Sequence, residues 1–139
     1  SALLLMRESE AEARGLKPIA RIAGHATQSQ HPSEFTIAPV GAIENLFNKT
    51  GWTKDDVDLY EINEAFAMVA MMPIIDLGLD PETVNIFGGA CAQGHPVGST
   101  GSRLIVTLMN ALKVKGKTKG VAALCIGGGE ATAMAIELI

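Results

Sequence analysis

The stretch GVAALCIGGGEATAMAIELI, residues 120–139, decides the fold that this sequence predicts. Two runs of small and branched apolar residues are joined by three glycines, a pattern typical of two strands connected by a tight turn. We therefore expect strands over 120–127 and 130–139, paired as a hairpin. The first strand carries Cys125 next to the glycines, so a reactive thiol lies where this strand ends.

Alternating strands and helices precede this hairpin. Short apolar runs ending at glycine or proline predict strands, and apolar residues at helical spacing predict helices. The expected strands are 2–6, 18–27, 57–63 and 82–90, with a loop over 28–39. The expected helices are 7–15, 40–52, 65–79 and 99–116, and Gly51 and Gly116 are the expected stops of the second and the last. The helix over 65–79 is apolar on nearly every side and is expected to be buried. This order predicts an α/β fold, a layered domain in which helices pack on a mixed β-sheet.

The composition fits one globular domain and excludes several classes of function. The chain has 139 residues, 47% hydrophobic and 19% charged, which suits a single domain over residues 1–139. Its net charge is −4 with both signs interleaved, so we expect no nucleic-acid partner, which would need clustered cations. No apolar run is long enough to span a bilayer, no signal peptide is visible, and the cysteines are few. We therefore expect a cytoplasmic protein with no membrane partner.

Three short motifs place chemically active side chains where predicted strands end. They are YEINEAFA at 60–67 with Asn63, GGACAQGHPVG at 88–98 with His95, and LCIGGGEA at 124–131 with Cys125. Open α/β sheets place their sites at the ends of strands. A histidine can accept a thiol's proton, a cysteine can act as an acid or a base, and an asparagine can hold a water or a carbonyl oxygen.

Each of these residues also has a purely structural interpretation. Cys125 taken alone fits a small core residue, because free cysteines are among the most buried residue types. His95 before a proline fits a hydrogen-bonded turn, and Asn63 fits the cap of the following helix. A zinc site made by Cys91, His95 and Cys125 would lack the paired ligand spacing of zinc motifs, and we expect no metal.

Taken together, the three motifs resemble those of the thiolase family, specifically the C-terminal domain of its acetyl-CoA acetyltransferase branch, over essentially the whole chain. Three ordered motifs are far more specific than any one of them. The resemblance implies the C-terminal half of the two-domain thiolase fold. It also implies the condensation of two acetyl-CoA to acetoacetyl-CoA and CoA, or the reverse thiolysis, as in fatty acid metabolism. Coenzyme A thioesters would be substrates, no separate cofactor is implied, and relatives are homodimers or homotetramers.

The resemblance implies a role for each motif residue. Cys125 would be the acid/base that removes or returns the α-proton of the acetyl donor. His95 would activate a nucleophilic cysteine and donate to a thioester oxygen, beside a water held by Asn63. The backbone N–H of Gly127 would belong to a second oxyanion hole, and a glycine would leave this donor uncrowded. The expected substrate-binding residues are Phe66 and Phe35.

In this family the nucleophilic cysteine belongs to the N-terminal half, and neither Cys91 nor Cys125 lies in that motif. We therefore expect the chain to be a fragment that begins partway into the first strand of the C-terminal domain. Its main partner would be the missing N-terminal thiolase half, and the isolated 139 residues are expected to be inactive.

Three alternatives stay open from the sequence. The first is a non-catalytic acyl-CoA-binding or assembly module, which the intact set of Asn63, His95 and Cys125 disfavours. The second is a longer-chain 3-ketoacyl-CoA thiolase, disfavoured because some of those relatives have a histidine in place of Asn63. The third is a β-ketoacyl synthase, from which the acid/base cysteine before glycines points away.

Overall fold

A computed structural model describes residues 1–139, and at its centre lies a four-stranded sheet in the order β1-β4-β3-β2. The strands are β1 (Ala20–Ser29), β2 (Leu59–Ile62), β3 (Lys119–Ile126) and β4 (Glu130–Leu138). β3 and β4 form the predicted antiparallel hairpin, β1 pairs antiparallel to β4, and β2 pairs parallel to β3. The predicted mixed sheet is confirmed.

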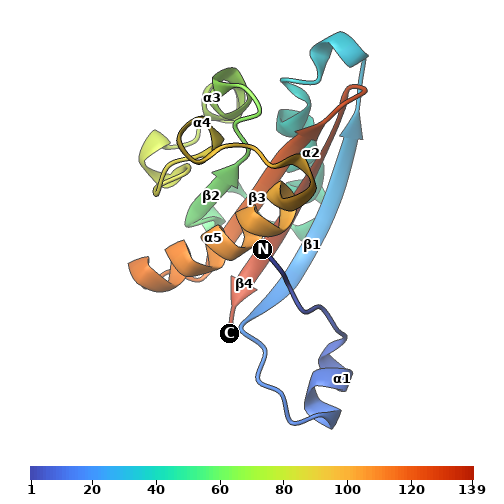
Figure 1. Ribbon diagram of the computed structural model, residues 1–139, viewed down its shortest axis with the longest axis vertical. Coiled ribbons are helices and arrows are strands. Elements are labelled where there is room, and N and C mark those ends of the chain that lie inside the picture. The colour runs from blue at the N-terminus through green and yellow to red at the C-terminus, as the bar shows by residue number, and fades with distance from the viewer.

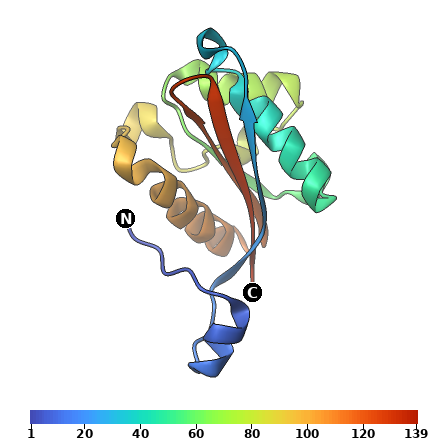
Figure 2. The same cartoon turned by 90° about the vertical axis from the view of Figure 1, so that its right-hand side faces the viewer.

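Helices cover both faces of this sheet. They are α1 (Glu8–Ala13), α2 (Ala38–Thr50), α3 (Ala67–Asp76), α4 (Ala90–Gln93) and α5 (Val97–Lys115). Seen along the sheet, α5 lies on one face and α2 on the other, while α1 projects away from these layers (Figures 1 and 2). The two longest helices end at Gly51 and Gly116, which take left-handed φ angles of 73° and 65°. Both stops are those that the sequence predicts.

The face of the sheet under α2 is packed with small apolar side chains. Its core contains Ala38, Ala42, Ile43 and Leu46 of α2 and Ala131, Ala133 and Ala135 of β4. The alternate residues of a strand point to the same face, so the three alanines of β4 form one row beneath the helix. Methyl-sized side chains let a helix lie close to the strands, so α2 packs tightly on this face of the sheet.

The face under α5 is packed with leucines. Leu104, Leu108 and Leu112 of α5 are buried together with Leu59, Ala122 and Ile136 of the sheet. Gly120 of β3 lies directly beneath this helix, since a Cβ there would come within 2.8 Å of Leu108 Cδ1. This close approach fixes α5 across the strands and brings its N-terminal turns to the end of β2.

Two predicted strands are wrong. Residues 2–6 pair with no strand and leave Leu4 and Leu5 81% and 65% exposed. An apolar run becomes a strand only where an edge accepts its backbone groups, and neither edge of this sheet does so here. The segment 82–90 makes a single bridge, between Val84 and Tyr60, before Asn85 turns with a positive φ of 50°.

The helix predicted over 65–79 is present as α3, but it is buried on one side only. Val69, Ala70 and Pro73 face the core, whereas Met71 and Ile75 are exposed. Because its sequence is apolar on nearly every side, the sequence does not indicate which side of α3 is buried. The exposed side of the helix is therefore also apolar.

Candidate active site

Asn63 comes directly after β2 and is held by the neighbouring strand. Its backbone N–H donates to Ala123 O of β3 at 2.9 Å, which extends the parallel pairing by one residue. Its side chain is fully buried. Because strand residues alternate between faces, Leu59, Glu61 and Asn63 share the face that α5 covers.

A chain of hydrogen bonds links Asn63 to the start of α5. Asn63 Nδ2 lies 3.4 Å from His95 Nε2, and His95 Nδ1 lies 2.7 Å from Thr100 Oγ1. Thr100 Oγ1 in turn donates to Pro96 O at 3.1 Å. On the other side, Arg103 Nη2 donates to Asn63 Oδ1 at 3.5 Å. Two of the three predicted chemical residues, Asn63 and His95, are therefore brought together.

The donors and acceptors of this chain determine where the protons lie. Arg103 can only donate, so the amide oxygen of Asn63 faces it and the NH2 group faces His95. The Thr100 hydroxyl gives its hydrogen to Pro96 O, so it accepts from the Nδ1–H of His95. The Nε2 of His95 is thus the unprotonated nitrogen, and it can accept a proton.

Glu64 ties the first motif to the second. Its Oε2 accepts from the backbone N–H of Cys91 at 2.9 Å, and its Oε1 accepts from Asn85 Nδ2 at 3.1 Å. A Cβ at Gly89 would lie 2.3 Å from the Glu64 carboxyl carbon, so the double glycine makes room for this clamp. Burial works against the charge of Glu64, but the hydrogen bonds from Cys91 and Asn85 outweigh it and lower the pKa of this carboxyl.

Cys125 lies at the end of β3, and it makes no hydrogen bond to Asn63 or His95. Alternation along β3 puts it on the same face as Val121 and Ala123, the α2 face, whereas Asn63 faces α5. The thiol is half-buried, and burial raises its pKa. Within this chain Cys125 is thus a protonated thiol at neutral pH, close to the end of β2 but not bonded to its residues.

The three glycines after Cys125 differ in what the local structure requires of them. Gly128 and Gly129 have positive φ angles of 97° and 89°. A Cβ at Gly129 would also lie 2.3 Å from Gln30 O, at the tip of β1. Gly127 is exposed and a Cβ there would meet nothing within 4 Å, so packing within this chain does not require a glycine there.

The two predicted substrate-binding residues lie side by side. The rings of Phe35 and Phe66 pack edge to face with centroids 6.0 Å apart. Phe66 comes directly before α3, and its residue is 59% exposed. This pair, with Phe66 exposed and Phe35 half-buried, is a surface that can bind an apolar group.

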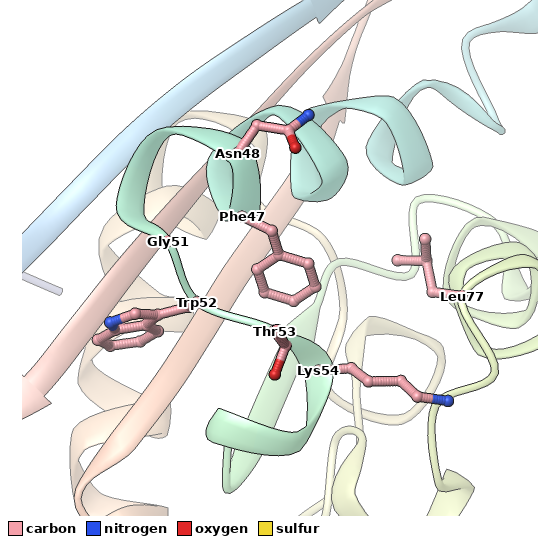
Figure 3. A pocket seen from close by; sticks show the side chains of 7 residues that line it. All are labelled: Phe47, Asn48, Gly51, Trp52, Thr53, Lys54 and Leu77. Carbon is pink, nitrogen blue, oxygen red and sulfur yellow. The ribbon is translucent and has the colours of Figure 1, made fainter.

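A separate hollow lies away from these motifs, between the C-terminal ends of α2 and α3 (Figure 3). Its volume is about 500 Å³, and it is lined by Phe47, Asn48, Gly51, Trp52, Thr53, Lys54 and Leu77. Lys119 Nζ stacks on the Trp52 ring at 4.9 Å. None of the predicted site residues lines this hollow, so it does not belong to the candidate site.

The structure contains no metal-binding cluster, no disulfide bond and no helix that could span a membrane. No three His, Cys, Asp or Glu residues gather closely enough to hold a metal ion, and both cysteines are free. None of the helices combines the length and the apolar character needed to cross a bilayer. Sequence reasoning missed Glu64, Thr100 and Arg103. The contacts of Thr100 and Arg103 depend on how α5 crosses β2, and those of Glu64 depend on the fold of residues 85–91.

Comparison with known proteins gives one consistent family. The sequence model described as "Thiolase, C-terminal domain" matches residues 16–138. The cytosolic acetyl-CoA acetyltransferase of Mus musculus is 50% identical over 137 residues, which are 99% of this chain and 34% of the mouse protein. The chain thus spans about a third of the length of the curated relatives that it matches.

Solved structures agree with this match. The acetyl-CoA acetyltransferase of Bacillus anthracis superposes with a TM-score of 0.92 at 42% identity, covering 96% of this chain and 34% of that one. A thiolase of Ascaris suum in complex with coenzyme A superposes with a TM-score of 0.90 at 41% identity, again covering 96% and 34%. The predicted thiolase-like α/β fold is confirmed.

Proposed function

The chain belongs to the thiolase family, as its C-terminal domain, and from this premise we propose that it supplies the acid/base half of a thiolase active site. In the complete enzyme the reaction would be the condensation of two acetyl-CoA to acetoacetyl-CoA and CoA, or the reverse thiolysis. The observation that carries this proposal is the hydrogen-bonded chain that leaves His95 Nε2 unprotonated, with the Asn63 NH2 group 3.4 Å away as its donor.

His95 acts first in this scheme. Its Nε2 takes the proton of a cysteine thiol contributed by an N-terminal thiolase half, and the thiolate attacks the carbonyl carbon of acetyl-CoA. The imidazolium then has two N–H donors, of which Nδ1–H stays on Thr100. The new Nε2–H is free to stabilise an oxygen that becomes negative, and the Asn63 NH2 group can hold a water for the same purpose.

Cys125 acts next. Its burial-raised pKa suits a proton donor, and the departing CoA thiolate takes the Cys125 proton as the acyl-cysteine forms. The resulting Cys125 thiolate removes the α-proton of a second acetyl-CoA, and the enolate attacks the acyl-cysteine. The nucleophilic thiolate is then expelled and recovers its proton from His95, so every group returns to its starting state.

The substrate would lie along the aromatic pair of Phe35 and Phe66. Phe35 and Phe66 offer an apolar surface next to the motif residues, as the pantetheine arm of coenzyme A requires. The Gly127 N–H, at an exposed turn, would donate to the adduct at the acyl-cysteine. The reaction needs no further cofactor, because the thioester itself activates the acyl group.

The proposal extends to partners and place. The N-terminal half that carries the nucleophile would be the main partner, within a homodimer or homotetramer of the complete enzyme. The matching Mus musculus protein is described as cytosolic, and we extend that location to the enzyme that contains this chain.

The testing experiment compares the complete enzyme with the isolated 139-residue chain. Thiolysis is followed by the loss of the 3-oxoacyl-CoA, with acetoacetyl-CoA and a long-chain 3-oxoacyl-CoA as alternative substrates. The proposal expects turnover of acetoacetyl-CoA by the complete enzyme and none by the isolated chain. Preference for the long-chain substrate would indicate the longer-chain thiolase instead, and binding without any turnover would indicate the non-catalytic module.

A further inference from the structure

Glu61 is a buried acid that the proposed reaction does not use. It lies in the middle of β2, its residue is 1% exposed, and neither carboxyl oxygen has a hydrogen-bond partner. Buried carboxyls without partners are rare, because leaving a charged or polar group unsatisfied is costly. Such a group in a strand that ends in the candidate site requires an explanation.

Arg103 of α5 is the positive charge that acts on Glu61, although no hydrogen bond or ion pair joins the two side chains. Its Nη2 donates to Asn63 Oδ1 at 3.5 Å and its Nη1 donates to Gln93 Oε1 at 3.4 Å, while its Nε is buried without a partner. The guanidinium is absent from every direct ion pair of the chain. The Arg103 charge is therefore balanced only by carboxylates at longer range.

Two charged groups act on Glu61, from the elements packed around it. Arg103 on α5 favours the carboxylate, and Glu64, just beyond the end of β2, disfavours it. On β3 its register partner is Ala122, which has no charge. Burial is the largest influence and raises the pKa of Glu61 to about 7, so the acid changes charge near neutral pH.

We propose that Glu61 is a positioning residue of the thiolase reaction: its carboxylate holds the Arg103 guanidinium in place, and Arg103 keeps the Asn63 amide turned toward His95. Arg103 is the group that orients the amide, since it is the donor on the oxygen side. Protonation of Glu61 removes the negative charge that holds Arg103, and the orientation of Asn63 is then lost. This inference rests on the function proposed above.

The test uses Glu61→Gln in the complete enzyme, with Glu44→Gln as the matched control because Glu44 is exposed on α2 and has no part in the site. At pH 8 we expect kcat for thiolysis to fall by about 10-fold to 100-fold with little change in KM, since a displaced catalytic group acts on the chemical step. Wild type should gain activity as pH rises through about 7, and Glu61→Gln should lose that rise.

A second measurement separates positioning from simple structural support. Gln is neutral, so Glu61→Gln should melt at a higher temperature than wild type at pH 8 while being less active. Glu61→Gln should also add little to the loss caused by Arg103→Gln, because both changes act through one guanidinium.

The outcomes are distinct. Lower activity with higher stability, and non-additivity with Arg103→Gln, support the inference. An active wild type whose Glu61→Gln variant keeps its kcat and its pH profile overturns it, and so does a variant that loses activity only by losing stability. If wild type and Glu44→Gln both fail to turn over acyl-CoA, the proposed function itself is wrong.

Discussion

The two faces of the sheet are packed in opposite ways. Under α2 the buried core consists of alanines, valines, isoleucines, leucines and Tyr60, whose hydroxyl donates to Lys54 O at 3.3 Å. Under α5 the leucines give way, toward the carboxyl end of β2, to the three buried polar residues of the chain, Glu61, Asn63 and Thr100. Buried polar groups are costly unless they are used or satisfied. The comparison teaches that apolar packing fills the α2 face, whereas the proposed site residues gather at the strand ends, with Asn63 on the α5 face and Cys125 on the α2 face.

The largest expected effect on this comparison comes from Cys125→Ser in the complete enzyme. A serine hydroxyl is a far weaker acid than a thiol, so exchange of the α-proton of acetyl-CoA with solvent should fall by at least about 100-fold. Acylation of the enzyme should remain measurable. Isotope exchange into acetyl-CoA is the measurement, with the exposed Cys91→Ser as control. Exchange near the wild-type rate would exclude Cys125 as the acid/base.

A change in the α2 packing should act on stability alone. Leu46→Ala removes a fully buried side chain of α2 and should cost about 2–5 kcal/mol of the free energy of unfolding. The folded fraction should keep its kcat, because Leu46 packs near Gly24, whose partner on β4 is Ala135, whereas Cys125 lies farther along the sheet, opposite Ala131. Denaturant unfolding and activity per folded molecule check this together. A large loss of kcat in fully folded Leu46→Ala protein would contradict the claim that the α2 packing acts on stability alone.

The polar face should make stability depend on pH. Burial raises the pKa of Glu61 from 4.5 to about 7, with Arg103 opposing and Glu64 adding to it. The folded state then binds this proton more tightly than the unfolded state, so the stabilisation is complete below about pH 4.5 and is lost as pH rises through about 7.

Glu61→Gln cannot lose this proton, and its gain over wild type should therefore grow with pH. At pH 8 the gain in the free energy of unfolding should approach, at most, about 3 kcal/mol. Unfolding at several pH values gives the measurement. A wild-type and variant difference that does not change between pH 4.5 and pH 8 would contradict the raised pKa.

The smallest expected effects distinguish two glycines of one turn. Gly129→Ala meets Gln30 O at 2.3 Å and has a φ of 89°, so it should cost about 1–3 kcal/mol of stability. Gly127→Ala meets nothing within 4 Å and should leave the free energy of unfolding nearly unchanged. Thermal melting of both variants is the comparison. Equal losses of stability in Gly127→Ala and Gly129→Ala would contradict the claim that only Gly129 is required by its contact with Gln30 O and by its φ angle.

Much of the fold follows from local sequence. The hairpin around the glycine turn and the helix stops at Gly51 and Gly116 are confirmed, since each depends on a few neighbouring residues. The strand over 2–6 is wrong because strand formation needs a partner edge, and an apolar run cannot say whether one is present. The exposed side of α3 was missed for the same reason, since burial depends on what covers a helix.

The site was predicted only in part. Asn63, His95 and Cys125 stand in recognisable motifs, but Asn63 meets His95 because the start of α5 lies at the end of β2, not because two strands end at one edge. Glu61 and Arg103 lie in an apolar strand and an ordinary helix, so neither stands out by pattern. Their relation exists only because α5 crosses β2, which spacing along the chain does not reveal.

The central claim is that the polar end of the α5 face makes His95 Nε2 a base. The most direct test is single-turnover acylation of the complete enzyme by acetyl-CoA, comparing His95→Ala with His25→Ala, whose histidine is exposed on β1. The account predicts that His95→Ala slows acylation by about 10²–10⁴-fold while His25→Ala does not. Acylation by His95→Ala within a few-fold of wild type would contradict it.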